Sequence, residues 1–135
     1  MLRAKILVVD DEPQVLQLAA SILDRAGYAT ATAPGPLRAL EIITGTGGFD
    51  LVVSDVVMPG MHGPELAKKI RLLSPSSSVL LMSGSVPAGQ LPRGIPFVGK
   101  PFSSSDLLRA VDKTLQKANR QRARPIAFSA GCGGQ

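Results

Sequence analysis

The chain has 135 residues, is 44% hydrophobic and carries a formal net charge of +5, which fits one domain with a substantial core. Its single cysteine excludes a disulfide framework and a multi-cysteine metal site. No apolar run approaches the roughly 20 residues of a membrane-spanning helix, and the amino-terminal apolar run is too short for a signal peptide. We therefore expect a soluble, cytoplasmic protein without a membrane partner.

The positive charge is concentrated near the carboxyl end. Residues 1–112 balance their acidic and basic side chains, and the excess comes from Lys113, Lys117, Arg120, Arg122 and Arg124. Basic tails can bind nucleic acid, but cations at the end of a helix also suit the helix dipole. We favour the second interpretation and do not expect nucleic acid as a partner.

The first half of the chain alternates strands with helices. Lys5–Val9 is a continuous apolar run, typical of a strand buried on both faces. Pro13 follows acidic residues and predicts a helix start, and Gly27 ends the apolar stripe of that helix. A second strand is predicted over 28–33, a helix from Pro36 to the glycine-rich 45–48, and a third buried strand over 51–53.

The second half repeats the pattern with one irregularity. A helix is predicted from Pro64, and strands are predicted over 79–82 and 97–98. Ser103, with Asp106 three residues later, resembles a capping box and predicts the start of a last helix that runs to residue 118. The intervening segment 84–96 contains three prolines and three glycines, which disfavour more than about a turn of helix. Residues 119–135 lose the apolar period and are predicted to be a basic, glycine-rich, disordered tail.

Repeated strand–helix units predict parallel strands with right-handed crossovers. The fold expected is a flavodoxin-like, doubly wound α/β domain over residues 1–118. It has a five-stranded parallel sheet with helices on both faces and a shortened fourth helix.

Ligands of such sheets bind at the carboxyl ends of the strands, and reactive side chains follow four of the predicted strands. They are Asp10 and Asp11, Asp55, Ser83 and Lys100. Clustered carboxylates raise one another's pKa unless a cation joins them, and Mg²⁺ favours carboxylate, water and phosphate oxygens. A lysine adds a point charge suited to phosphate, so the set predicts chemistry on a phosphoryl group carried by an aspartate.

Four separated motifs then resemble the receiver domain of bacterial two-component response regulators. They are ILVVDDE (6–12), DLVVSDVVMPGMHG (50–63), LLMSGS (80–85) and FVGKPF (97–102). The resemblance implies that Asp55 is the phosphoacceptor, with Ser83 as switch hydroxyl, Phe97 as switch aromatic and Lys100 at the phosphoryl group. It also implies a cis Lys100–Pro101 bond, and Mg²⁺ held by Asp11, Asp55 and the Val57 carbonyl, with Asp10 acting through water.

The same resemblance implies the partners. A sensor histidine kinase or a histidine phosphotransfer protein would donate the phosphoryl group, and the chain would be a phosphorylation-dependent switch, not an enzyme. The MSG sequence and the short segment after it resemble receivers of hybrid sensor kinases. Because segment 84–96 lacks a full helical face, we expect a monomer or a weak dimer.

Two alternatives belong to other classes. A small Mg²⁺-dependent phosphohydrolase with an aspartyl nucleophile would need a second aspartate two residues after Asp55, where this chain has Val57. A nucleic-acid adaptor would lose salt-dependent binding when residues 119–135 are deleted.

Overall fold

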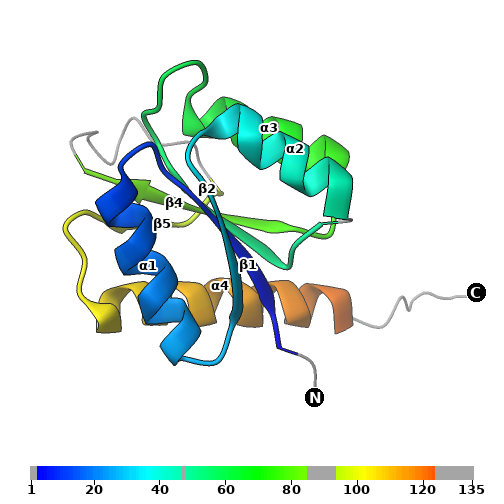
Figure 1. The fold of residues 1–135 in the computed structure, drawn as a ribbon. Coiled ribbons are helices and arrows are strands. Elements are labelled where there is room, and N and C mark those ends of the chain that lie inside the picture. Colours follow the sequence, from blue (N-terminus) through cyan, green and yellow to red (C-terminus); the bar gives the residue numbers. More distant parts are fainter. Residues whose placement is uncertain (1–2, 47, 85–93, 124–135) are drawn as a thin grey trace, which may run out of the picture.

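A computed structural model of the protein describes residues 3–46, 48–84 and 94–123 (Figure 1). All strands pair in parallel, in the order β2-β1-β3-β4-β5. The flavodoxin-like, doubly wound sheet predicted from the sequence is therefore confirmed. Its elements are β1 (Lys5–Val9), α1 (Pro13–Arg25), β2 (Ala29–Ala33), α2 (Pro36–Thr46), β3 (Leu51–Asp55), α3 (Gly63–Leu73), β4 (Ser78–Ser83), β5 (Phe97–Gly99) and α4 (Ser104–Ala123).

The central strands are buried because helices cover both faces of the sheet. In β1, Leu7 and Val9 belong to the core cluster that includes residues of α2 and α3. Ile6 and Val8, which alternate with them, belong to the cluster shared with α1 and α4. This alternation is the expected consequence of the two-residue period of a strand, and it explains why the run Lys5–Val9 is apolar without interruption.

Local signals place the helix starts. Pro13 occupies the first turn of α1, where its missing N–H costs no hydrogen bond. A reciprocal capping box opens α4: the Asp106 N–H donates to Ser103 Oγ at 3.0 Å, and the Ser103 N–H donates to Asp106 Oδ2 at 3.3 Å. Both pairs satisfy backbone donors that a helix start otherwise leaves free.

The end of α4 differs from the sequence prediction. The helix continues to Ala123. The prediction of a disordered tail over 119–135 is therefore wrong for residues 119–123. The loss of apolar period was misleading because a helix turn exposed to solvent needs no apolar face, and Arg, Gln and Ala favour helix. The cations Lys113, Lys117 and Arg120 consequently lie on α4, and of these three Arg120 is in the last turn, where a cation suits the negative end of the helix dipole.

Two further predictions fall largely outside the described residues. The shortened fourth helix concerns segment 84–96, of which the structure describes only Gly84 and 94–96. The remainder of the tail, 124–135, is also outside the described part of the chain. Among the helices that are described, none is long and apolar enough to cross a membrane.

Candidate functional site

The strand ends bring the predicted polar side chains to one edge of the sheet. Asp10 follows β1, Asp55 ends β3, Ser83 ends β4 and Lys100 follows β5. The parallel register pairs Asp55 with Met82 and Ser83 with Gly99, so these ends are level with one another. The backbone N–H of Lys100 also donates to the carbonyl oxygen of Ser83 at 2.7 Å, which fixes the start of the Lys100 loop against β4.

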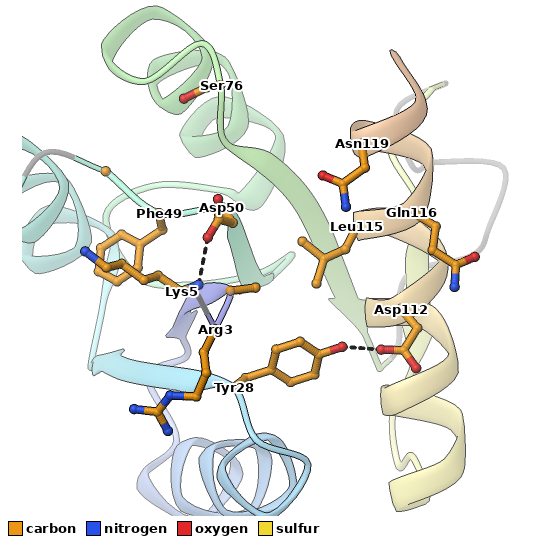
Figure 2. Close-up of a pocket in the computed structure, with 12 residues that line it drawn as sticks. Arg3, Lys5, Tyr28, Phe49, Asp50, Ser76, Asp112, Leu115, Gln116 and Asn119 are labelled. Atoms are coloured by element: carbon orange, nitrogen blue, oxygen red, sulfur yellow. Dashed lines mark hydrogen bonds between the residues drawn. The ribbon is translucent and has the colours of Figure 1, made fainter. Parts of the chain in front are cut away.

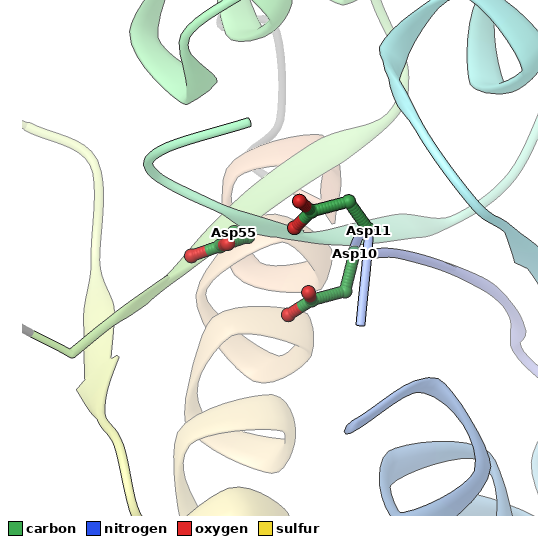
Figure 3. Close-up of side chains that lie close together, drawn as sticks. All are labelled: Asp10, Asp11 and Asp55. Atoms are coloured by element: carbon green, nitrogen blue, oxygen red, sulfur yellow. The ribbon is translucent and has the colours of Figure 1, made fainter. Parts of the chain in front are cut away.

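Three carboxylates form the centre of this edge. Asp10, Asp11 and Asp55 each offer an oxygen within 4.8 Å of the others, and Figure 3 shows Asp10 and Asp11 at the end of β1 with their carboxylates on the side of Asp55. Asp10 is fully buried and Asp55 is 8% exposed, whereas Asp11 is exposed. Two of the three negative charges are thus held away from water.

Lys100 is the cation that faces these carboxylates. Its Nζ donates to Asp10 Oδ2 at 2.8 Å and lies 3.3 Å from Asp55 Oδ1. Burial alone would lower the pKa of Lys100, but the hydrogen bond to Asp10 and the charge of Asp55 outweigh burial and raise it. The ammonium is therefore firmly charged at neutral pH.

Asp55 has a raised pKa despite this neighbour. Burial is the largest cause, and the charge of Asp10 acts in the same direction, while Lys100 lowers the pKa by less than their sum. One lysine does not compensate the negative charge gathered here. The environment of Asp55 therefore favours either protonation of its carboxylate or the binding of another cation beside it.

Glu12 follows Asp10 and Asp11 at the end of β1 in the motif ILVVDDE, and sequence reasoning gave it no role at this edge. Its backbone N–H donates to Asp10 Oδ1 at 2.9 Å, and its Oε1 lies 4.0 Å from Lys100 Nζ. The only available signal was its position two residues after Asp10 in the same loop. The pairing of residues near position 10 with Lys100 depends on the fold, because 90 residues separate them along the chain.

The other predicted residues are positioned as follows. Ser83 is buried, the side chain of Val57 is 52% exposed, and Phe97 is the first residue of β5 and 46% exposed. The Lys100–Pro101 peptide bond is cis, as the resemblance implied. Their functional roles stay predictions, since position alone does not test them.

The residues present fit a hard divalent cation. The donor set is made of carboxylate oxygens only, the ligand type that Mg²⁺ prefers. Two of its members are nearly or completely buried, and their charge exceeds that of Lys100. A divalent cation would balance this charge without requiring a new protein ligand.

A second hollow, of about 790 Å³, lies at the opposite edge of the sheet (Figure 2). There Tyr28 donates a hydrogen bond to Asp112 of α4, and the Lys5 N–H donates to Asp50 Oδ2 at 2.8 Å. Burial, with the hydrogen bond and charge of Asp112, raises the pKa of Tyr28 to about 12. The carboxylates of Asp50 and Asp112 in its lining thus accept hydrogen bonds from within the protein, so this hollow resembles a structural junction more than a ligand site.

Fold and site together define a doubly wound α/β domain with a cluster of carboxylates, bridged by a lysine, at the carboxyl edge of its sheet. The family described as the response regulator receiver domain matches residues 6–112. Sensor kinase CckA of Brucella abortus is 38% identical over 121 residues, which are 84% of this chain and 13% of that protein. Sporulation initiation phosphotransferase F of Bacillus subtilis is 30% identical over 120 residues, which are 85% of this chain and 96% of that protein.

A solved CheY-like receiver domain protein from Methanospirillum hungatei has a TM-score of 0.80 and 26% identity, over 89% of this chain and 99% of that one. The chain therefore belongs to the family of response regulator receiver domains. Members of this class act as phosphorylation-dependent switches in two-component systems. The chain spans only a small part of the CckA relative.

Proposed function

We propose that Asp55 is the residue that accepts the phosphoryl group. The observation that carries this proposal is the position of Asp55 at the end of the central strand β3. It is almost buried, 3.3 Å from Lys100 Nζ and next to the carboxylates of Asp10 and Asp11. Asp10 is enclosed and already bonded to Lys100, and Asp11 is exposed on the loop. Asp55 therefore combines a protected setting with a cation on one side.

The proposed donor is a phosphohistidine of a sensor histidine kinase or a histidine phosphotransfer protein. A carboxylate oxygen of Asp55 attacks phosphorus as the bond from phosphorus to the histidine nitrogen breaks, and that nitrogen keeps the bonding electron pair. Transfer needs the donor, phosphorus and acceptor roughly in line. Lys100 offsets charge on the phosphoryl oxygens. Mg²⁺, held directly by Asp11, Asp55 and the Val57 carbonyl and through water by Asp10, would supply further charge neutralisation.

The proposed response involves Ser83 and Phe97. Ser83 ends the strand next to β3 and is buried, and in this proposal its hydroxyl bonds a phosphoryl oxygen on Asp55. Phe97 is half exposed on the edge strand β5 and could turn inward when the Ser83 loop moves. A local charge change would thus bias a two-state element.

The relatives leave two arrangements for the whole protein. Likeness to a segment of a sensor kinase supports the hybrid-kinase type, whereas likeness across 96% of a single-domain phosphotransferase supports a free-standing receiver. In either arrangement we propose that the domain is a switch without turnover of a separate substrate. Val57 supports this, because it occupies the position where an aspartyl phosphohydrolase would carry its general acid.

The test is labelling with a small acyl phosphate and Mg²⁺, followed by intact mass and mapping of the modified residue. We expect one added phosphoryl group on Asp55, none on Asp55→Asn, and normal labelling of Asp24→Asn, a control at an exposed position of α1. Full labelling of Asp55→Asn, or mapping to Asp11, would reject the assignment. Repeated turnover of an aryl phosphate would contradict the switch without enzymatic activity.

A further inference from the structure

We propose that Glu12 is a positioning residue for Lys100. In this proposal, which rests on the proposed function of the Asp10–Asp11–Asp55 cluster, Glu12 takes up the Lys100 ammonium when a divalent cation occupies those carboxylates. The residue would keep Lys100 charged and close to Asp55 without leaving it between the metal ligands.

The need for such a residue follows from a conflict at the site. Lys100 Nζ is 2.8 Å from Asp10 and 3.3 Å from Asp55, and the same two carboxylates belong to the candidate cation cluster. An ammonium and a divalent cation that share these oxygens repel each other. Cation binding must therefore either displace Lys100 or be weakened by it.

Glu12 provides the alternative partner. Among the described residues, three carboxylates form ion pairs with Lys100, and Glu12 is the one that lies outside the cation cluster. Its Oε1 is already 4.0 Å from Nζ, so the ammonium needs to move little to reach it. Its side chain is 65% exposed, whereas that of Asp10 is fully buried.

The backbone around Glu12 supports this role. Glu12 is the N-cap residue of α1 but makes no side-chain capping hydrogen bond, so its carboxylate is not engaged at the helix start. The bond from its N–H to Asp10 Oδ1 ties the loop to the cluster. The backbone of Glu12 is consequently fixed beside the cluster, and its carboxylate lies 4.0 Å from Lys100 Nζ.

Mg²⁺ affinity of the unphosphorylated chain, measured by calorimetry, tests the proposal. Glu12→Gln should weaken Mg²⁺ binding about two- to five-fold, the range of an exposed ion pair. Glu12→Asp keeps the charge, but its shorter side chain withdraws from Lys100 and is well suited to cap α1. It should weaken binding to a similar degree. Glu41→Gln, at an exposed position of α2, is the matched control, and this variant should bind Mg²⁺ as tightly as the wild type does.

A double-mutant cycle separates an effect of Glu12 that acts through Lys100 from the general effect of its negative charge on Mg²⁺. In a Lys100→Met background, Glu12→Gln should leave Mg²⁺ affinity unchanged, because no ammonium remains to be moved. Wild-type affinity in Glu12→Asp, or equal weakening by Glu12→Gln with and without Lys100, would overturn the proposal. The Glu12→Asp arm keeps its force even if Lys100→Met does not fold. These measurements use no phosphoryl donor. Failure of Asp55 labelling would therefore reject the proposed function without deciding whether Glu12 affects Mg²⁺ binding.

Discussion

Asp55→Asn should stabilise the protein when no divalent cation is present. The substitution removes one negative charge from a nearly buried position and keeps the shape of the side chain. Because burial and Asp10 raise the pKa of Asp55, the folded state binds a proton at this carboxyl more readily than the unfolded chain does. The charged form of Asp55 is therefore a cost to folding at neutral pH.

The size of the effect follows from opposing contributions. A pair of charges at roughly 4 Å interacts by about 4 kcal/mol at an effective dielectric constant of about 20. Attraction to Lys100 at 3.3 Å and repulsion from carboxylates within 4.8 Å are of this order and largely cancel. The burial of one charge remains, so we expect a gain of about 1 kcal/mol, the lower end of the cost of burying a polar group in a protein.

The difference in stability between the wild type and Asp55→Asn should change with pH in a direction that the raised pKa of Asp55 determines. A raised folded pKa leaves wild type and Asp55→Asn equally stable below the unfolded pKa of about 4. The wild type then loses relative stability as the pH rises through the folded pKa. Urea unfolding in a chelator at several pH values from 4 to about 7 measures this difference, and the same series in excess Mg²⁺ should reverse the order, because the wild type gains cation binding.

A variant less stable than the wild type in chelator at neutral pH would refute this reasoning. It would mean that the attraction between Asp55 and Lys100 exceeds burial and repulsion from Asp10. An unchanged order in Mg²⁺ would instead count against Asp55 as a cation ligand. Unfolding of Asp24→Asn under the same conditions controls for the general loss of one surface charge.

Three further predictions concern other parts of the molecule. Lys100→Met should cost about 3 kcal/mol of unfolding free energy in chelator, because it leaves the fully buried Asp10 without its cation, and urea unfolding with and without Mg²⁺ should show partial recovery. Tyr28, the single tyrosine in a chain without tryptophan, should ionise near pH 12 by near-ultraviolet absorbance, and Asp112→Asn should move that pKa toward 10. Val57→Asn should speed loss of the phosphoryl group from Asp55, because an amide can orient water and valine cannot; equal lifetimes by timed intact mass would contradict this.

The sequence was most informative where one physical requirement dominated. The strand Lys5–Val9 was predicted with its observed bounds because a strand covered on both faces must be apolar throughout. The capping box at Ser103 and Asp106 was recognised because its two hydrogen bonds connect residues three apart. In both cases the signal is local and needs no knowledge of the rest of the fold.

The remainder depends on tertiary structure. The end of α4 was missed because a helix turn in water is determined by propensity and charge, not by an apolar face. The convergence of Asp10, Asp11, Asp55 and Lys100 followed from the rule for strand ends, but the particular bond between Lys100 and Asp10 did not. Nor did the approach of Glu12, which depends on side-chain directions in two loops that are distant in the sequence.

Helix α4 runs along the strands and carries several cations to the edge of the sheet opposite the carboxylate cluster. Carboxylates gather at the ends of β1 and β3, while Lys113, Lys117 and Arg120 lie on the half of α4 that reaches the opposite edge. These described charges therefore form an electric dipole whose negative end is the candidate reaction site. A charged partner exerts a torque on such a molecule before contact, and this torque weakens when salt shortens the Debye length below about 10 Å. Encounters at low ionic strength will favour a partner that presents its positive face to the acidic cluster. The fold therefore influences the orientation of a partner during its approach, before any contact forms.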